Sequence, residues 1–417
     1  MSSQYWVETL GCPKNQVDSD KLEGTLLADG LTPAASPADA DVVVVNTCAF
    51  IEAARQESID TILSLAGTRK ADARLVVTGC MAERYGTELA EAIPEADLVA
   101  GFGVPVTLGA KSRTGNIPLL DLLNLPRPPS AAPWAYVKVA EGCDRTCGFC
   151  AIPSFRGPQR SRTPESILAE VDALGAAEIV LVAQDLASYG KDRPELGAGS
   201  IIDLVSAVAA RVPRVRLLYL YPSELTDGLI SVIQSTGVHY FDLSLQHVSK
   251  PLLRRMRRWG EGQRFLDRMA SIRERMPDAA FRSNFIVGYP GETEADHDQL
   301  LEFVSSAQLD WCGFFSFSRE EGTYAAGLDG QVEAGLVADR LAELTELQDR
   351  ITTDRRAALV GTVCEVLVDA PGVGRSHREA PEIDGIINVP IELAVGSFVK
   401  VEITGAAGPD LEAVCRG

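Results

Sequence analysis

The chain has 417 residues, of which 46% are hydrophobic and 23% are charged, so it is long enough to bury more than one hydrophobic core. Its 39 Lys and Arg against 58 Asp and Glu give a net charge of −19, which disfavours a protein whose surface binds a nucleic-acid backbone. No apolar run reaches the roughly 18–20 residues that span a bilayer, and the first residues carry no secretory signal pattern. We therefore expect a cytoplasmic protein of two or three domains with no membrane partner.

The first hundred residues repeat one pattern three times, in which a short apolar strand ends just before a cysteine. The predicted strands cover residues 5–10, 41–45 and 74–78, and the cysteines that follow them are Cys12, Cys48 and Cys80. Helical stretches alternate with these strands, which predicts a parallel sheet with covering helices. Because the carboxyl ends of parallel strands meet at one edge of a sheet, the three cysteines should converge there. The alternative is three ordinary buried thiols.

Six further strands are predicted in the middle of the chain, separated by amphipathic helical stretches. They cover residues 135–139, 178–182, 216–221, 240–245, 281–287 and 311–317. Six strand–helix units in series favour an open, partial version of the (β/α) barrel, short of the eight units that close it. A Pro-rich linker candidate at residues 113–133 precedes them, and a long helical run at 332–358 follows. The last sixty residues predict a small all-β unit with short strands around Gly and Pro turns.

Cysteine is the residue type that carries the chemistry. Nine cysteines in a chain without an export signal favour metal or redox chemistry over a disulfide framework. The strongest motif is Cys143-x-x-x-Cys147-x-x-Cys150, directly after the first barrel strand. Three thiolates on one short loop suit three corners of a cubane iron–sulfur cluster and leave the fourth iron open. Structural zinc is disfavoured, because it prefers four ligands in paired spacings.

With this motif the chain resembles the radical S-adenosylmethionine (SAM) superfamily, whose fold is the partial (β/α)6 barrel. Nearly all 417 residues resemble one branch of it, the methylthiotransferases. The resemblance implies an α/β fold in three parts: an amino-terminal parallel-sheet domain at 1–115, a radical SAM core at 129–358 and a small β-barrel called TRAM at 359–417. It also implies two 4Fe–4S clusters, one held by Cys143, Cys147 and Cys150 and an auxiliary one by Cys12, Cys48 and Cys80. The other three cysteines, Cys312, Cys364 and Cys415, match no family ligand.

Several short stretches resemble the branch that modifies an aspartate of small ribosomal subunit protein twelve, often called RimO. They are Gly-Cys-Pro-Lys-Asn from Gly11, Ile-Pro-Ser-Phe-Arg-Gly from Ile152, Leu-Tyr-Pro from Leu220, Leu-Gln-His from Leu245 and Ala-Pro-Glu-Ile-Asp-Gly from Ala380. Residues 359–417 hold four Lys or Arg and nine Asp or Glu, a net charge of −5, which is a poor footprint for RNA. An acidic TRAM, with residues such as Glu382 and Asp384, would instead face a basic ribosomal protein. An acidic surface can also serve solubility alone.

SAM is expected across the carboxyl ends of the barrel strands. Phe149 is a candidate for packing on the adenine, and Gln184, Gln246 and Ser283 are candidates for ribose and carboxylate contacts. Gly288 would let the backbone approach the adenine closely. The alternatives are ordinary loop packing for Phe149 and mutual hydrogen bonding inside the barrel for the polar residues.

Two basic runs stand out in the acidic chain. The first comprises Arg156, Arg160 and Arg162, and the second comprises Arg254, Arg255, Arg257 and Arg258. They could steer an acidic substrate group, although charge runs are more often solvated helix faces.

The resemblance implies an enzyme that inserts a methylthio group at the β-carbon of an aspartate in the ribosomal protein. It implies two SAM molecules per turnover and an external reductant such as a ferredoxin or flavodoxin. Nucleic acid is not a favoured partner except through the ribosome. The first alternative is the branch that 2-methylthiolates adenosine (i6A or t6A) in tRNA. The second is a non-catalytic ribosome-binding factor whose cysteines hold a structural metal.

Overall fold

A computed structural model describes residues 3–104, 106, 121–197 and 199–416. The chain divides into two compact units. The first comprises Met1–Pro129, Tyr136–Arg145 and Cys150–Ala173, and the second comprises Ser130–Ala135, Thr146–Phe149 and Leu174–Gly417. The predicted domain limit at residue 115 lies outside the described residues, as does part of the linker candidate at 113–133, and the three-domain limits remain predictions. Among the described residues, no helix is both long enough and apolar enough to cross a bilayer.

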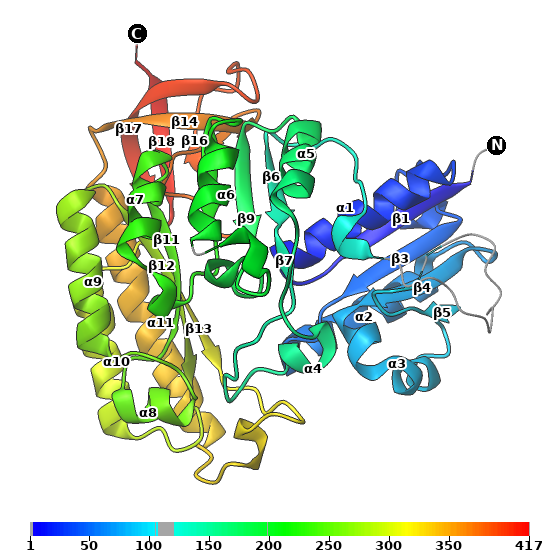
Figure 1. Ribbon diagram of the computed structural model, residues 1–417, viewed down its shortest axis with the longest axis horizontal. Coiled ribbons are helices and arrows are strands. Elements are labelled where there is room, and N and C mark those ends of the chain that lie inside the picture. The colour runs from blue at the N-terminus through cyan, green and yellow to red at the C-terminus, as the bar shows by residue number, and fades with distance from the viewer. Residues whose placement is uncertain (1–2, 105, 107–120, 198, 417) are drawn as a thin grey trace. The chain divides into compact units, whose positions relative to one another are not determined.

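The sheet of the first unit is parallel and has five strands in the order β2-β1-β3-β4-β5. The strands are β1 (Gln4–Thr9), β2 (Thr32–Pro33), β3 (Val42–Thr47), β4 (Arg74–Gly79) and β5 (Leu98–Val99). They alternate with the helices α1 (Pro13–Ala28), α2 (Glu52–Thr68) and α3 (Cys80–Ala92), as Figure 1 shows. The parallel α/β fold predicted for this part of the chain is confirmed.

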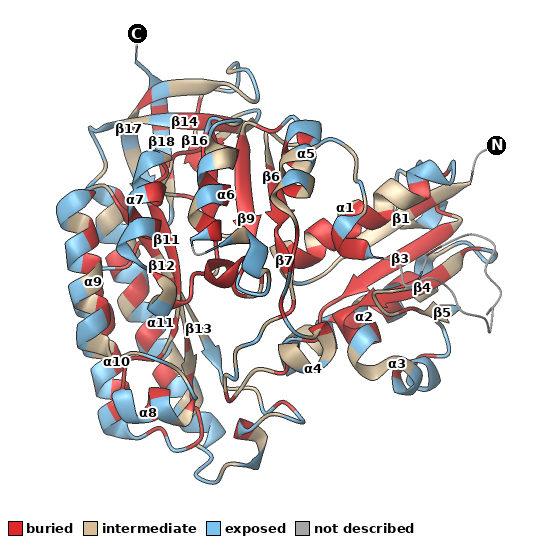
Figure 2. Ribbon diagram, viewed as in Figure 1, coloured by how far each residue is buried: buried red, intermediate tan, exposed pale blue. Residues whose placement is uncertain are grey.

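Strand β3 is buried on both of its faces, which explains its run of four valines (Figure 2). Val42 and Val44 pack on one face in a cluster with Leu22 and Leu26 of α1. Val43 and Val45 pack on the other face in a second cluster, which includes Ile62 of α2. Because side chains alternate along a strand, one sequence run supplies both cores and fixes the strand's register.

Short elements in the first unit surround the cysteine motif. Strands β7 (Ala140–Glu141) and β8 (Arg160–Ser161) pair antiparallel on either side of it. Helix α4 (Ile152–Arg156) begins two residues after Cys150, and α5 (Pro164–Leu174) follows. Strand β6 (Trp134–Lys138) is divided between the units, since Trp134 and Ala135 belong to the second.

The second unit contains the remaining predicted barrel strands. They are β9 (Glu178–Val182), β10 (Arg214–Leu217), β11 (Tyr240–Gln246), β12 (Ala280–Val287) and β13 (Trp311–Ser316). Strands β9 and β10 pair in parallel, and so do β11, β12 and β13. An isolated parallel bridge between Leu220 and Leu243 continues the series from the end of β10 to β11. The partial barrel predicted from the sequence is confirmed.

Strand β10 differs most among the barrel strands from its predicted range, 216–221, whereas β6 is displaced by one residue from 135–139. Strand β10 begins two residues earlier and ends at Leu217, because Tyr219 has a φ of +64° and leaves the extended conformation. The Tyr219 backbone N–H donates to a carboxylate oxygen of Asp242 at 2.8 Å, which supports this turn. A positive φ at a tyrosine has no signature in the hydrophobic pattern, so the pattern placed the strand end too late.

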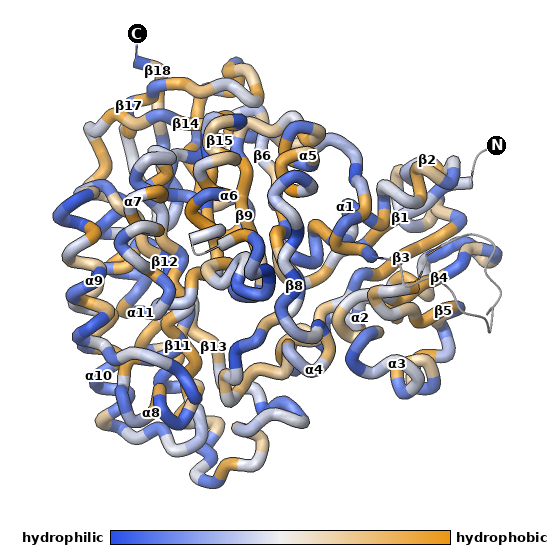
Figure 3. Tube along the Cα trace, viewed as in Figure 1, coloured by the Kyte–Doolittle hydropathy of each residue, from blue (hydrophilic) through white to orange (hydrophobic). Residues whose placement is uncertain are grey.

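Helices cover the strands of the second unit (Figure 1). They are α6 (Ser200–Ala209), α7 (Asp227–Ser235), α8 (Lys250–Arg255), α9 (Gly262–Arg275), α10 (Glu294–Ala307) and α11 (Ala334–Ala357). Helix α9 buries Phe265, Met269 and Ile272, which recur at the spacing of one helix face, while its hydrophilic residues are blue in Figure 3. Thr293 and Asp296 form a reciprocal capping box at the start of α10.

The last sixty residues form a closed five-stranded barrel in the order β14-β15-β16-β18-β17. Its strands are β14 (Val363–Ala370), β15 (Val373–Arg375), β16 (Ile387–Asn388), β17 (Phe398–Ala407) and β18 (Asp410–Cys415). Val366, Ile387, Val401 and Leu411 fill its interior. The predicted all-β unit is confirmed.

A buried charge network joins this small barrel to strands β9 and β10. Glu178 of β9 accepts from Arg216 of β10 at 2.7 Å and forms an ion pair with Arg375 of β15 at 3.1 Å, and all three side chains are almost fully buried. Arg216 also donates to the carbonyl oxygens of Ser376 and His377. Burial alone would raise the pKa of Glu178, but Arg375 and Arg216 outweigh it and lower that pKa to about 2.

A second buried contact corrects one expectation about the acidic carboxyl-terminal residues. The Asp384 carboxylate has no exposed side-chain area, because it accepts from Arg282 of β12 at 2.6 Å and from the Tyr240 hydroxyl of β11 at 2.6 Å. Glu379 is likewise buried and pairs with Arg356 of α11. Asp384 therefore binds the small barrel to the strands and cannot face a basic partner, so the expectation was wrong for this residue.

The Glu178 network gives a prediction about stability. The substitution Glu178→Gln should lower the free energy of unfolding at pH 7 by about 3 kcal/mol, because it leaves Arg216 and Arg375 buried without a counter-charge. The lowered pKa means that the ion pair stabilises the fold above the ordinary value of about 4.5 and is lost as the pH falls towards 2. The difference between the two proteins in denaturant unfolding should therefore shrink below pH 4.5. The control Glu346→Gln, in an exposed pair with Arg350, should change little at any pH.

Candidate functional site

Three cysteines of the first unit follow the carboxyl ends of neighbouring parallel strands. Cys12 is the N-cap of α1, Cys48 follows β3 directly, and Cys80 is the first residue of α3. The register pairs Thr9 with Asn46 and Thr47 with Gly79, so the three strands end at one edge of the sheet. The structure thus brings together the residues that the sequence placed about thirty positions apart.

The cysteine loops approach so closely that one of them requires glycine. Gly11 has a φ of +94°, and a Cβ at this position would lie 2.8 Å from Cys48 Cβ and 2.9 Å from Cys48 Sγ. Both distances are shorter than side-chain carbons tolerate, and the backbone conformation also disfavours any other residue. Gly11 is therefore what allows the loop that carries Cys12 to lie beside Cys48.

Asn15 ties the loops to one another. Its side-chain amide donates to the carbonyl oxygens of Leu10 at 2.9 Å and Thr47 at 3.1 Å. Its own backbone carbonyl accepts from the side chain of Asn46 at 2.8 Å. The side chain is fully buried, so these bonds form without competition from water and hold two strand ends in one arrangement. The sequence motifs did not predict a role for Asn15, although the residue lies in the stretch Gly11–Asn15 that supports the family resemblance.

Arg156, the last residue of α4, reaches into the same site. Its guanidinium donates to Cys80 Sγ at 3.0 Å and to Asn15 Oδ1 at 2.7 Å. The other side of the group donates to Glu141 at 2.9 Å and to Asp18 at 3.2 Å, and Lys138 pairs with both of these carboxylates. The side chain is 3% exposed, so Arg156 is neither a solvated face nor a free steering charge. The sequence did not predict that Arg156 contacts the cysteine site.

The thiols of this cluster differ in acidity. Burial, followed by the neighbouring Cys12 and Cys80, raises the pKa of Cys48 to about 12. Burial also raises the pKa of Cys80, although Arg156 opposes it. For Cys12 burial is outweighed by Lys14 and Arg156, so its pKa lies below the ordinary value. Three thiolates can coexist here only if a cationic ligand compensates their charge, as a metal centre does.

The starts of two helices also favour negatively charged sulfur at this site. Cys12 caps α1, which has 16 residues, and Cys80 opens α3, which has 13. The N–H groups at a helix start carry a partial positive charge and favour anionic sulfur. The sheet edge is therefore suited to a group that is anionic overall and is held by thiolates.

The second cysteine triad lies on the loop between β7 and α4. In the first unit, the Cys143 N–H donates to the carbonyl of Gly157 at 3.1 Å, and Cys143 Sγ accepts from the Arg145 N–H at 3.4 Å. Gly142 precedes it with a φ of +77°, and a Cβ there would lie 2.1 Å from the carbonyl oxygen of Pro158. Cys150, the last cysteine of the motif, is half-buried.

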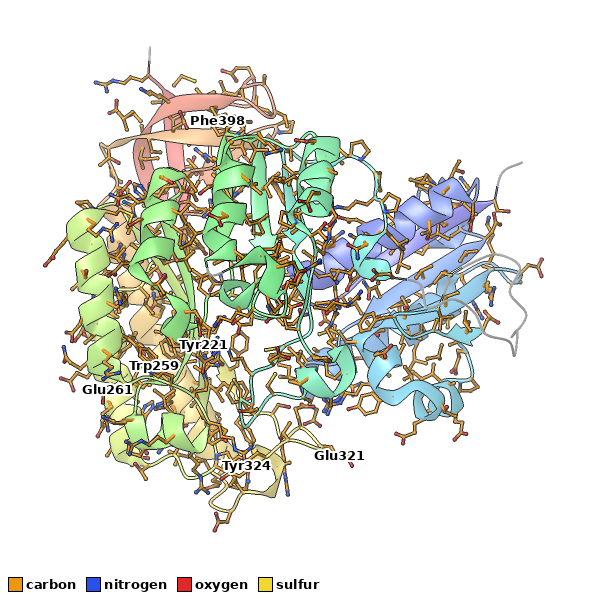
Figure 4. All side chains as sticks on the ribbon, in the orientation of Figure 1. Tyr221, Trp259, Glu261, Glu321, Tyr324 and Phe398 are labelled. Atoms are coloured by element: carbon orange, nitrogen blue, oxygen red, sulfur yellow. The ribbon has the colours of Figure 1, made fainter. Side chains whose placement is uncertain are left out.

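Cys147 belongs to the second unit, where its sulfur accepts from Arg258 at 3.2 Å. The guanidinium of Arg258 lies over the Tyr221 ring at 4.4 Å, and Figure 4 labels Tyr221 beside Trp259, whose N–H donates to the tyrosine oxygen. The next residue, Gly148, donates to the Met256 carbonyl at 2.8 Å and accepts from the Ala325 N–H at 2.7 Å. This end of the motif loop is therefore held by backbone bonds on both sides.

Two of the residues predicted to contact SAM have structural partners. The Ser283 hydroxyl is buried and donates to the carbonyl of Leu243 at 2.7 Å, so it can only accept from a ligand. Gly288 has a φ of +80°, and a Cβ there would lie 2.5 Å from Val337 of α11. The close approach that requires glycine is thus made to a helix, which explains this glycine without a ligand.

The other three candidates lie at strand ends or in the motif loop. Gln246 ends β11 with a φ of +71°, an uncommon conformation for a residue other than glycine. Gln184 follows β9 by two residues, and Phe149 is half-buried between Cys147 and Cys150. The positions agree with the expected place for a ligand of such a barrel, and the contacts themselves remain predictions.

All nine cysteines lie in the described part of the chain, and none forms a disulfide. Within the described ranges, no three His, Cys, Asp or Glu side chains are gathered tightly enough to hold one metal ion. A tetrahedral zinc, with Zn–S bonds of about 2.3 Å, would need sulfurs within about 4 Å of one another. A cubane cluster spaces its thiolates more widely, because each binds a different iron atom. The assignment of either triad to a cluster remains a prediction.

The remaining cysteines and arginines occupy other environments. Burial raises the pKa of Cys312 and, to about 11, that of Cys364, so both are inert thiols, and Cys415 is exposed near the chain end. Arg162 is buried and pairs with Glu170 at 2.6 Å. Arg160 pairs with Asp121 on the surface.

Comparisons with known proteins find family profiles and named relatives that match nearly the whole chain. Family profiles match three successive parts: UPF0004, described as an uncharacterized protein family, at residues 4–101, the radical SAM superfamily at 137–304 and the TRAM domain at 360–415. A protein of Kineococcus radiotolerans named ribosomal protein uS12 methylthiotransferase RimO is 41% identical and covers 97% of this chain and 95% of its own length. A protein of the same name from Geobacter sulfurreducens is 42% identical over 97% and 96%.

Among solved structures, the radical SAM methyltransferase TsrM from Kitasatospora setae is similar with a TM-score of 0.49 and 14% identity. The alignment covers 95% of this chain and 84% of that chain.

The close approach at Gly11 gives a prediction with a matched control. Gly11→Ala should destabilise the metal-free protein more than Gly30→Ala, in chemical denaturation of both. Gly30 has a similar φ of +85°, but a Cβ there would meet nothing within 4 Å, so it reports the backbone strain alone, about 1–2 kcal/mol. The excess cost at Gly11 measures the contact with Cys48. Equal destabilisation by the two substitutions would contradict the close approach.

Proposed function

The chain belongs to the RimO family of radical SAM methylthiotransferases, and on this basis we propose that it transfers a methylthio group to ribosomal protein uS12. The observation that carries the proposal is the presence of two separate cysteine triads on one chain, each with an arginine that donates a hydrogen bond to one of its sulfurs. One triad would suffice for SAM cleavage alone. A second triad is what a sulfur transfer would add.

The acceptor we propose is the β-carbon of an aspartate in uS12, with two SAM molecules used per turnover. Two 4Fe–4S clusters, when bound, would supply reductive cleavage of one SAM to a 5′-deoxyadenosyl radical and a site for sulfur that the other SAM methylates. No acid or base of the protein could remove a hydrogen from so unactivated a carbon. The protein's own residues would bind, orient and shield these groups.

Cys12, Cys48 and Cys80 are the proposed ligands of the auxiliary cluster. Arg156, which also donates to Asn15, would donate to the sulfur of Cys80, and the starts of α1 and α3 would favour the negative charge of the thiolates. Gly11 would keep Cys48 close enough to share the site.

Cys143, Cys147 and Cys150 are the proposed ligands of the cluster that cleaves SAM. Three cysteines leave one iron open for the amino and carboxylate groups of SAM, and Phe149, Gln184, Gln246, Ser283 and Gly288 are proposed around its remaining parts. The geometry ranks these differently. Gln246, with a strained backbone at a strand end, is the best supported, whereas Ser283 and Gly288 already have structural partners.

The basic protein uS12 would meet a surface whose acidic residues are only partly available. Asp384 and Glu379 form internal ion pairs and are not accessible to a partner. Exposed carboxylates such as Glu392 and Glu412 would instead attract a basic partner. We propose a cytoplasmic reaction supplied with electrons by a ferredoxin or flavodoxin. Transfer to adenosine in tRNA is the competing outcome, and the relatives named for uS12 favour the protein substrate.

Iron content tests the two-cluster assignment. The anaerobically reconstituted protein should hold about eight irons per chain. The triple variants Cys12→Ala/Cys48→Ala/Cys80→Ala and Cys143→Ala/Cys147→Ala/Cys150→Ala should each hold about four. Cys364→Ala, which replaces a half-buried cysteine outside both triads, should keep all eight. If a triple variant retained the full iron content, the corresponding triad would not be a cluster site.

Product analysis tests the division of labour and the substrate. Cys48→Ala should still cleave SAM to 5′-deoxyadenosine when reduced by dithionite but should form no methylthiolated uS12, and Cys147→Ala should do neither. Mass spectrometry of uS12 and of tRNA incubated with the wild-type enzyme gives the readout. Methylthiolated tRNA with unmodified uS12 would exclude the proposed substrate, and product from either variant would exclude the two-cluster mechanism.

A further inference from the structure

Each cysteine triad is accompanied by one arginine that donates a hydrogen bond to one of its sulfurs. Arg156 Nη2 lies 3.0 Å from Cys80 Sγ, and Arg258 Nη1 lies 3.2 Å from Cys147 Sγ. In each case the same group also lies over an aromatic ring at 4.4 Å, Phe102 for Arg156 and Tyr221 for Arg258.

Both arginines are held in place by further bonds, so neither can swing away from its sulfur. Arg156 is anchored by Glu141, Asp18 and Asn15. Arg258 is anchored by the carbonyl oxygen of Ser244, to which its second terminal nitrogen donates. The two terminal nitrogens of a guanidinium lie in one plane, so one can donate to the residue that holds the side chain while the other donates to the sulfur. A lysine, with its single nitrogen, could not do this.

Hydrogen bonds and positive charge at the sulfurs of an iron–sulfur cluster stabilise the reduced, more negative form. We propose that Arg156 and Arg258 are positioning residues that set the reduction potentials of the two clusters, each acting on its own triad alone. The inference rests on the proposed function, because it requires both triads to hold clusters. It assigns to two members of the basic runs a role different from steering an acidic substrate.

The environments of the two arginines predict unequal effects. Arg156 stands beside Glu141 and Asp18, so its removal would leave two carboxylates near the cluster with only Lys138 to balance them. Arg258 makes no ion pair with a carboxylate among those found in the described chain, and its removal would subtract one charge and one hydrogen bond. The auxiliary cluster should therefore shift more than the SAM-cleaving cluster.

The test measures each cluster in the full-length chain with the other triad replaced by alanines. Arg156→Met should make reduction of the auxiliary cluster at least tenfold less favourable, a shift of about 59 mV to lower potential for one electron. Arg258→Met should shift the SAM-cleaving cluster in the same direction by less. The readout is a dithionite titration followed by the electron paramagnetic resonance signal of the reduced cluster, which requires neither SAM nor substrate.

Each variant serves as the control for the other, since Arg156→Met should leave the SAM-cleaving cluster unchanged and Arg258→Met the auxiliary one. Arg162→Met controls for the loss of a buried ion pair, because Arg162 is as buried as Arg156 and donates to Glu170 and to the backbone carbonyl of Lys138. It should move neither potential. If Arg156→Met does not fold, Arg156→Lys decides, and it should lower the auxiliary potential by a smaller amount.

Three results would overturn the inference. The first is an auxiliary potential that moves no more in the Arg156 variants than in Arg162→Met. The second is a shift of both clusters by either variant, which would indicate a general change of structure. The third is the absence of iron from the chains that keep one triad, which would overturn the proposed function as well. A normal iron content with unmoved potentials would overturn this inference alone.

Discussion

The cysteine site of the first unit depends on the buried guanidinium of Arg156. Its partners come from α1, from the end of β7 and from the start of α3, so one group joins three segments that are far apart in the sequence. A charge so buried is tolerated only because Asp18 and Glu141 compensate it, and these carboxylates in turn hold Lys138. Asn15 fills the remaining bond and fixes two strand ends. The cysteine loops are thereby positioned before any metal is bound.

The same solution recurs in the second unit for a different purpose. Glu178 is shared between Arg216 and Arg375, and Asp384 between Arg282 and Tyr240, so that buried ion pairs rather than apolar contacts alone join the small barrel to the strands. Ion pairs demand a particular geometry, whereas apolar surfaces can slide. The small barrel is therefore fixed against β9–β12 in one orientation. Removing it as a separable module would leave Arg214 and Arg216 without the carbonyl oxygens of Arg375 and His377, to which they donate.

The fold was predictable from the sequence because it rests on periodic burial. Four consecutive valines in β3, strands of regular spacing and helices with one apolar face are local patterns that read directly as elements. The cysteine sites were equally accessible, since the strand-end rule places Cys12, Cys48 and Cys80 together without coordinates. What failed was local conformation: Tyr219 turns with a positive φ that no pattern announces, and β10 was misplaced accordingly. Gly288 illustrates the same limit, because the sequence shows that a glycine is present but not which neighbour requires it.

Charge was the property that the sequence described least well. The excess of carboxylates predicted an acidic surface, yet the side chains of Asp384, Glu379 and Glu178 are buried and form ion pairs with arginines. A residue has the same formal charge on the surface and in the interior, so composition does not distinguish exposed carboxylates from buried ones. The distinction requires knowing which residue of another segment each carboxylate contacts. The basic runs divide in the same way, with Arg160 on the surface and Arg156 and Arg162 inside. Two members of these runs, Arg156 and Arg258, donate hydrogen bonds to cysteine sulfurs, and the role proposed for both is to act on those sulfurs rather than on a substrate.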